Sequence, residues 1–136
     1  MPAGLEITVE EIQREVDLRR PSMYIGTPRA EADMVEVLAG VNDSRTTGAP
    51  VVLFIANRDT DSSKYERFRT VPRPGHADLT ARNKYGDAVD LRGGGQFSGR
   101  MTAPVVAAGA IAKAMLATAG IQIAAYTQQL GRLVDE

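Results

Sequence analysis

Residues 103–119, "APVVAAGAIAKAMLATA", decide the fold because they predict a helix that is apolar on every side. Lys113 is the only charged residue in this stretch. A helix at the surface of a soluble protein keeps a polar face toward water, whereas a helix that is hydrophobic all round is buried. We therefore expect more than one neighbouring element to cover this helix, in the middle of a layered fold or at a subunit interface.

The ends of this helix are marked as well. Thr102 suits the N-cap, and Pro104 suits the first turn. Gly120 suits the position that closes the last turn. Together these residues predict a helix from residue 103 to about residue 119.

The segment before the helix, "LRGGGQFSGRMT" (91–102), has the ingredients of an anion site. The glycine run 93–95 leaves backbone N–H groups accessible, and the start of the helix is the positive end of its dipole. Arg92 and Arg100 flank the run. The spacing matches neither the P-loop nor the dinucleotide-binding fingerprint, and a simple tight turn is the alternative interpretation.

Another helix is predicted near the amino terminus. Thr8 and Glu11 have the spacing of a capping box, in which each side chain accepts a hydrogen bond from the other residue's backbone N–H. The apolar side chains of Val9, Ile12 and Val16 fall on one face of the helix that would follow. Pro21 is expected to end it because proline lacks the N–H that a helix needs.

Two strands are predicted next, followed by a long irregular region. Residues 33–41 alternate apolar and polar side chains, and residues 51–57 form a continuous apolar run. The turn-forming residues 42–50 between them predict antiparallel pairing. Residues 58–99 show weak periodicity, and so long an irregular stretch is usually functional or disordered. "IQIAAY" (121–126) predicts a further strand.

Length and composition predict one domain. A chain of 136 residues, 43% hydrophobic and 24% charged, resembles an ordinary soluble domain. We see no internal repeat and no linker, so residues 1–136 are expected to fold as one unit.

Charge and residue types argue against several functions. The net charge of −1 disfavours a nucleic-acid binder or a binder of anionic membranes, which needs uncompensated Lys and Arg. The chain has no cysteine and one histidine, so no cysteine-based or histidine-rich metal cluster is expected. The amino terminus lacks the layout of a secretory signal, and the longest apolar run, 103–112, is shorter than the roughly 20 residues that span a bilayer. We expect a cytoplasmic location and no membrane partner.

Basic side chains gather in residues 67–100. Seven basic residues stand there against three acidic ones, Asp78, Asp87 and Asp90. The basic residues are Arg67, Arg69, Arg73, Arg82, Lys84, Arg92 and Arg100. A local anion site fits this pattern better than a polyelectrolyte surface does.

The histidine, His76, lies in this basic region, within "VPRPGHADLTARNKYGD" (71–87). An imidazole with the ordinary pKa of about 6.5 can act as a general acid near neutral pH. Arg73 would favour loss of the imidazolium proton, and Asp78 would oppose it. A histidine whose hydrogen bonds are satisfied within a turn is the alternative interpretation.

Three motifs resemble one family. "RPGHADLTARNKYG" (73–86) is similar to "RPGHADYT…KYG" of the chorismate synthase family. "DLRGGGQFSGRMTAPVVAAGAIAK" (90–113) is similar to "DYRGGG…S.R.TA..VAAGAIAK" of the same family. Residues 19–57, which begin "RRP", resemble its amino-terminal third, and the whole resemblance covers residues 2 to about 131.

The resemblance implies an enzyme that converts 5-enolpyruvylshikimate 3-phosphate to chorismate in the shikimate pathway. This reaction is a 1,4-elimination of phosphate that needs reduced FMN although it has no net redox change. The resemblance also implies an α+β fold, in which a helical layer packs against antiparallel β-sheet, and a homotetramer. The apolar helix 103–119 would suit the inner layer.

The roles of single residues follow from the same resemblance. His76 matches the histidine that is assigned to proton transfer around the flavin. The residues that match ligands of the anionic substrate are Arg19, Arg73 and Arg100. The residues that match the FMN-contacting tripeptide are Gln96, Phe97 and Ser98. The resemblance implies no metal.

Some family features have no match in this sequence. The family begins with an SHG-type segment that carries a second catalytic histidine, and its carboxy-terminal half would follow residue 133. The chain is therefore expected to correspond to an amino-terminal portion without that first segment. Tyr24 stands where a second loop arginine is usual, and Gln96 and Phe97 stand where many members have Arg and Ser.

Two other interpretations stay open. The chain could be a shortened, non-catalytic relative that oligomerises through helix 103–119 and at most binds an anion. "RRPSMYIG" (19–26) also resembles the "KRPGMYIG" segment of gyrase-type ATPases. No Glu-Asn-Asp helix or Gly-rich lid pattern accompanies that segment.

Overall fold

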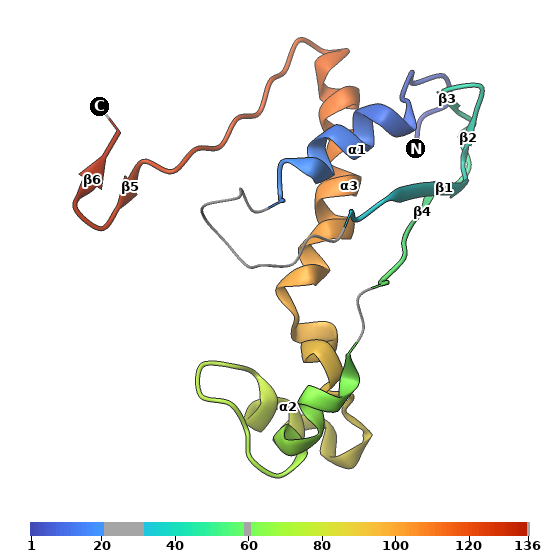
Figure 1. Ribbon diagram of the computed structural model, residues 1–136. Coiled ribbons are helices and arrows are strands. Elements are labelled where there is room, and N and C mark those ends of the chain that lie inside the picture. The colour runs from blue at the N-terminus through green and yellow to red at the C-terminus, as the bar shows by residue number, and fades with distance from the viewer. Residues whose placement is uncertain (21–31, 59–60, 136) are drawn as a thin grey trace.

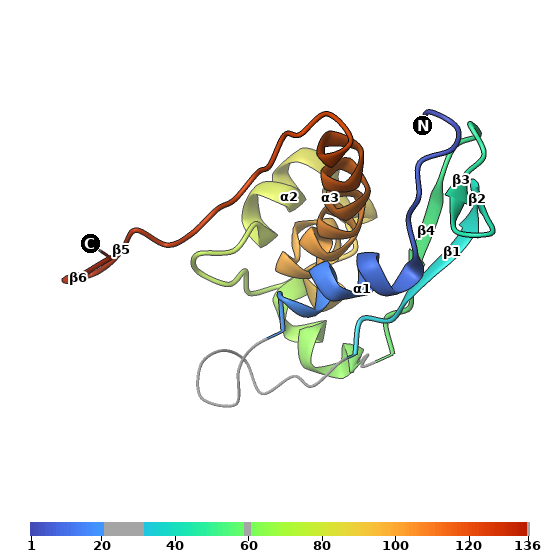
Figure 2. The same ribbon diagram turned by 90° about the horizontal axis from the view of Figure 1, so that it is seen from above.

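The computed structural model describes residues 1–20, 32–58 and 61–135, and its elements are those of the α+β class. Helix α1 (Val9–Asp17) crosses helix α3 (Thr102–Ala117), and both pack against a two-stranded ribbon (Figure 1). The ribbon consists of β1 (Val35–Ala39) and β4 (Val52–Ile55). A smaller cluster of helical turns lies at the start of α3, and the chain beyond α3 extends away from the rest (Figures 1 and 2).

Helix α1 begins at the predicted capping box. The backbone N–H of Glu11 donates to Thr8 Oγ1 at 3.2 Å, and that of Thr8 donates to Glu11 Oε2 at 2.8 Å. The helix ends at Asp17, and the turn that follows reaches Arg20. Pro21, Tyr24 and most of the segment that resembles gyrase lie outside the described residues.

The antiparallel ribbon confirms the predicted hairpin. Val35 pairs with Ile55, and Val37 pairs with Leu53. The register shifts between Val37 and Ala39, which marks a bulge. A second small hairpin of β2 (Val41–Asn42) and β3 (Arg45–Thr46) lies between these strands, mostly within residues 42–50, where the sequence predicts a turn.

The hydrophobic core lies where α1, α3 and the ribbon meet. Its buried side chains are Ile7, Ile12, Val16, Val35, Ala107, Ala110 and Ile111. Small alanines on α3 let α1 approach closely, and the branched side chains of α1 fill the space between the helices. Lys113 of α3 pairs with Glu15 of α1 at 2.6 Å at the rim of this contact.

Only one face of α3 is covered. Its buried residues are Ala103, Ala107, Ala110 and Ile111, whereas Val105 is 68% exposed. The expectation of more than one neighbour is met, because α1 and β4 both contact the helix, but among the described residues they leave its other side exposed. The alternative, that the other side lies at a subunit interface, stays a prediction.

The start of α3 also differs from the expectation. Thr102 has helical dihedral angles, and its hydroxyl donates to Gly99 O at 2.6 Å, so it is not the N-cap. The short turn η4 (Gly99–Met101) precedes α3 directly, and the side chain of Ser98 caps that turn by accepting from Arg100 N. The combined helix Gly99–Ala117 has 19 residues and is long and apolar enough to cross a membrane by length and composition alone. The core helix of a soluble protein meets the same criteria.

The predicted irregular region contains a helix. Short turns η1 (Ser62–Arg69), η2 (Gly86–Ala88) and η3 (Arg92–Phe97) surround α2 (Asp78–Tyr85). Helix α2, "DLTARNKY", carries few apolar side chains, so the sequence has no hydrophobic period that could have revealed it.

The strand predicted at residues 121–126 is absent from the described structure. Those residues are exposed and form no ladder, and the tail ends in a minimal hairpin of β5 (Gln129–Leu130) and β6 (Leu133–Val134). The pattern "IQIAAY" was typical of a strand, but a strand forms only where a neighbouring strand supplies hydrogen bonds.

The Ile12→Ala substitution tests the core. Ile12 is fully buried between α1 and α3, so the cavity that this change leaves should lower the free energy of unfolding by about 2–5 kcal/mol. Leu18→Ala, at a position that is 78% exposed, is the control and should change it little. Urea unfolding followed by circular dichroism measures both, and equal effects would contradict this packing.

Candidate functional site

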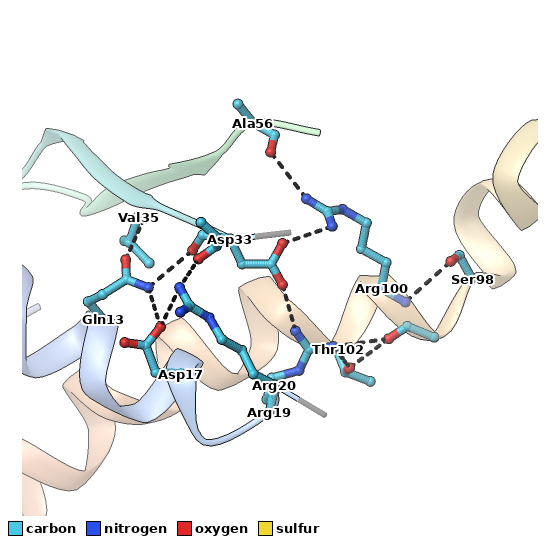
Figure 3. A network of polar contacts seen from close by, with 12 residues as sticks. Gln13, Asp17, Arg19, Arg20, Asp33, Val35, Ala56, Ser98, Arg100 and Thr102 are labelled. Carbon is cyan, nitrogen blue, oxygen red and sulfur yellow. Dashed lines mark hydrogen bonds and ion pairs between the residues drawn. The ribbon is translucent and has the colours of Figure 1, made fainter. Parts of the chain in front are cut away.

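Two of the predicted anion ligands share one carboxylate. Arg19 follows α1, Arg100 lies in η4, and Asp33 precedes β1 (Figure 3). Arg19 Nη1 lies 3.3 Å from Asp33 Oδ2, and Arg100 Nη1 lies 2.8 Å from Asp33 Oδ1. The fold thus brings together three segments that are far apart in the sequence.

Backbone and hydroxyl oxygens orient the two guanidinium groups further. Arg19 Nη2 donates to Thr102 Oγ1 at 2.8 Å, and Arg100 Nη2 donates to Ala56 O at 3.1 Å. Both groups lie near the start of the helix that begins at Gly99, which carries partial positive charge. One carboxylate faces two guanidinium groups and a helix start, so the local charge favours a further anion.

A cavity of about 310 Å³ adjoins Arg100 and the glycine run. Its polar lining includes Arg92, Ser98 and Arg100, and glycines of the run contribute backbone. Side chains from the end of β4 and the start of α3 supply an apolar wall. A concavity lined by two arginines thus adjoins the glycine run, and its use as an anion cradle stays a prediction.

The glycine run needs glycine for geometric reasons. Gly93, Gly94 and Gly95 all have positive φ angles, which other residues adopt at a cost. At Gly95 a Cβ atom would also collide with the backbone carbonyl of Asp90, whereas the space around Gly93 is open. The run is thus a tight reversal that packs against residue 90.

Arg92 is anchored by a neighbouring carboxylate at the surface. Its Nε and Nη2 donate to Asp90 oxygens at 2.6–3.1 Å, and its backbone N donates to Asp90 Oδ1 at 3.0 Å. Hydrogen bonds from the Arg92 side chain lower the pKa of Asp90 to about 2. The pair is exposed to water, so it adds little to stability.

A buried ion pair closes the turn that carries His76. Arg73 Nε and Nη2 each donate to Asp78 at 2.8 Å, and Arg73 N donates to Asp78 Oδ2 at 3.0 Å. The hydrogen bonds from the Arg73 side chain lower the pKa of Asp78 to about 2. The ion pair between Arg73 and Asp78 therefore holds the shape of the turn that lies between them.

Aromatic rings cover the guanidinium group of Arg73. Its Cζ lies 4.4 Å from the ring centre of Phe68 and 5.5 Å from that of Tyr65, both in η1. The Arg73 side chain is 18% exposed. In this structure Arg73 links the His76 turn to η1, and η1 in turn contacts η3.

The remaining predicted site residues lie apart from the arginine cluster. His76 is exposed and is not among the residues that line the cavity at the glycine run. Gln96 and Phe97 are exposed, and the Phe97 ring lies 6.4 Å from that of Tyr85. Ser98 alone of the tripeptide lines the cavity. That His76 and the glycine run face one bound molecule stays a prediction.

Sequence reasoning missed Asp33. It was assigned to the first residue of a strand, whereas β1 begins at Val35 and Asp33 has a φ angle of +43°. A lone aspartate before an apolar run carries no signal of its role. Only the folded chain places it between Arg19 and Arg100.

Comparison with known proteins identifies the family. The family profile described as chorismate synthase matches residues 1–136. The chain belongs to the chorismate synthase family. Among curated proteins, the chorismate synthase of Dehalococcoides mccartyi is 52% identical over 135 residues, which cover 98% of this chain and 37% of that protein. The chorismate synthase of Aeropyrum pernix is 53% identical over 131 residues, which cover 96% of this chain and 34% of that protein.

The match extends over a limited part of these relatives. In a third, the chorismate synthase of Thermococcus kodakarensis, 48% identity covers 98% of this chain and 38% of that protein. The chain thus spans somewhat more than a third of the length of the curated chorismate synthases it matches.

The ion pair at the His76 turn predicts a pH-dependent stability. The folded-state pKa of Asp78, about 2, lies below its ordinary value of 3.8, so the pair stabilises the fold above pH 4 and loses this effect as the pH falls toward 2. Asp78→Asn should cost roughly 2 kcal/mol at neutral pH and much less near pH 2. Thermal unfolding across this range measures the difference. The exposed Asp90→Asn is the control, and an Asp78→Asn cost that stays constant with pH would contradict the assignment.

The glycine run can be tested with two alanine substitutions, Gly93→Ala and Gly95→Ala. Gly93 (φ +62°, ψ +10°) lies in the left-handed region, where alanine costs about 1–2 kcal/mol, whereas Gly95 (φ +53°, ψ −137°) has a conformation that is costlier for alanine. Only Gly95→Ala adds a collision with the Asp90 carbonyl, so its melting temperature should fall further. Differential scanning calorimetry compares the two variants, and equal losses would show that the backbone at residue 90 does not limit the run.

Proposed function

We propose that this chain forms part of a chorismate synthase site, which converts 5-enolpyruvylshikimate 3-phosphate to chorismate with reduced FMN. The observation that carries the proposal is the cationic cluster beside the glycine-run cavity, in a chain that belongs to this family. The substrate carries a phosphate that must leave, and guanidinium groups stabilise departing phosphate by charge and hydrogen bonds.

The residues that line the cavity, with Arg19 held beside Arg100 by Asp33, fit an anionic ligand with an apolar body. Arg19 and Arg100 would hold the phosphate of the substrate, with the start of the helix at Gly99 adding positive potential. Ser98 and the neighbouring Gln96 and Phe97 would contact the flavin. Reduced FMN, when bound, supplies electron density transiently.

His76 would transfer a proton near the flavin. His76 is exposed on a turn whose two ends are fixed by the Arg73–Asp78 pair, so its ring is accessible to a ligand. Arg73 is proposed as a further substrate ligand at this turn, and it would have to share its guanidinium group between Asp78 and the substrate.

We also propose that residues 1–136 fold as one domain, with the helical layer against antiparallel sheet that the family resemblance implies. The exposed side of α3, which includes Val105, supports assembly of identical subunits up to a tetramer. A cytoplasmic location without nucleic-acid or membrane partners belongs to the same proposal.

Flavin spectroscopy tests the function. Under anaerobic conditions, addition of 5-enolpyruvylshikimate 3-phosphate to the chain with reduced FMN should change the flavin absorbance, and chorismate should form. Arg100→Ala should weaken substrate binding about tenfold or more, because it removes a charged hydrogen-bond donor. Arg45→Ala, an exposed arginine on β3, is the matched control. An unchanged flavin spectrum without chorismate would contradict the proposal.

A second candidate is a non-catalytic relative that binds an anion or oligomerises. The observations that favour it are the arginine cluster around Asp33 and the exposed side of α3, which would serve anion binding and assembly without a flavin. Phosphate binding without any change in the flavin spectrum would support this second function.

A further inference from the structure

Asp33 has an unusual backbone conformation for a residue other than glycine. Its φ angle of +43° lies in the left-handed region, which aspartate tolerates better than most side chains but still at a cost. Such conformations persist where the surrounding structure fixes them, and they often accompany functional sites.

Helix α1 fixes the chain at Asp33 and just after it. Gln13 Nε2 donates to Asp33 O at 3.4 Å, and Gln13 Oε1 accepts from Val35 N at 2.8 Å (Figure 3). The amide of one glutamine therefore holds the backbone before β1 and leaves the Asp33 side chain directed toward the two arginines.

The Asp33 carboxylate is largely buried and is used by both arginines. Its side chain is 14% exposed, and those of Arg19 and Arg100 are each 23% exposed. Oδ2 accepts from Arg19, whereas the buried Oδ1 faces Arg100 as an ion pair without a hydrogen bond among the described residues. The two guanidinium groups would repel each other if this carboxylate were absent.

We propose that Asp33 is a positioning residue, which holds Arg19 and Arg100 together so that both can bind one phosphate group. The inference rests on the proposed function, because it takes these arginines as the phosphate ligands. Asp33 acts through them and does not touch the phosphate itself.

Two effects of removing this carboxylate have opposite signs. Loss of a negative charge beside the arginines would strengthen anion binding if Asp33 were only a counter-ion. Loss of the bridge would weaken binding if Asp33 positions the arginines, because they would then have to be ordered by the anion itself. The direction of the change therefore separates the two roles.

The test is a titration of the chain with inorganic phosphate, followed by NMR of the arginine side-chain N–H groups. Asp33→Asn keeps the size of the side chain and tolerates positive φ, and it should weaken phosphate binding about tenfold. Asp43→Asn is the matched control, because Asp43 also has positive φ, +46°, and is exposed far along the hairpin. It should leave the dissociation constant within about twofold of wild type.

A double-mutant cycle keeps the inference testable if Asp33→Asn does not fold. Arg19→Lys and Arg100→Lys should each weaken phosphate binding, and together they should weaken it less than the product of the two single effects. Such coupling is expected because the bridge joins the two groups into one unit. Independent, multiplicative losses would overturn the inference.

The outcomes distinguish this inference from the proposed function. Phosphate binding that is unchanged or tighter in Asp33→Asn overturns the positioning role of Asp33. It does not contradict the proposed flavin-dependent reaction. A wild-type chain that does not bind phosphate also overturns it, because there is then no anion site to position. The titration uses no flavin, so an unchanged flavin spectrum contradicts the proposed function alone.

Discussion

Two guanidinium groups at the positive end of a helix repel each other, and a negative charge between them offsets that repulsion. Asp33 supplies that charge, and the structure around it is arranged to keep it there. Helix α1 carries Arg19, the ribbon begins just after Asp33, and the start of the α3 helix carries Arg100. The same three elements form the hydrophobic core, so the packing that stabilises the chain also sets the spacing of the charges.

The second group of charges is organised differently. Arg73 and Asp78 close a short loop by themselves, and the rings of η1 cover the guanidinium group. This contact is local in sequence and needs little help from the core. It gives the His76 turn a fixed shape, while the imidazole stays exposed. Between the two charged regions, η1 contacts η3, which is followed along the chain by η4.

The apolar surface of α3 is buried only in part by the described residues. Alanines on one side pack against α1 and β4, and the other side, with Val105, faces outward. The composition of the helix indicated cover by more than one neighbour, and among the described residues α1 and β4 supply that cover on one side. The remaining side has the character of a surface that another subunit or further polypeptide would bury.

The sequence by itself determined the capping box of α1, the antiparallel pairing of residues 35–39 with 52–55, and the reversal at residues 93–95. Each of these depends on neighbouring residues, whose spacing or special backbone freedom is visible in the chain. Its motifs also predicted the family, which the comparisons confirmed. Only the tertiary structure decided that Asp33 bridges two arginines and that "IQIAAY" (121–126) forms no strand. A carboxylate becomes a bridge only when distant segments bring two cations to it, and an apolar run becomes a strand only when another strand lies beside it.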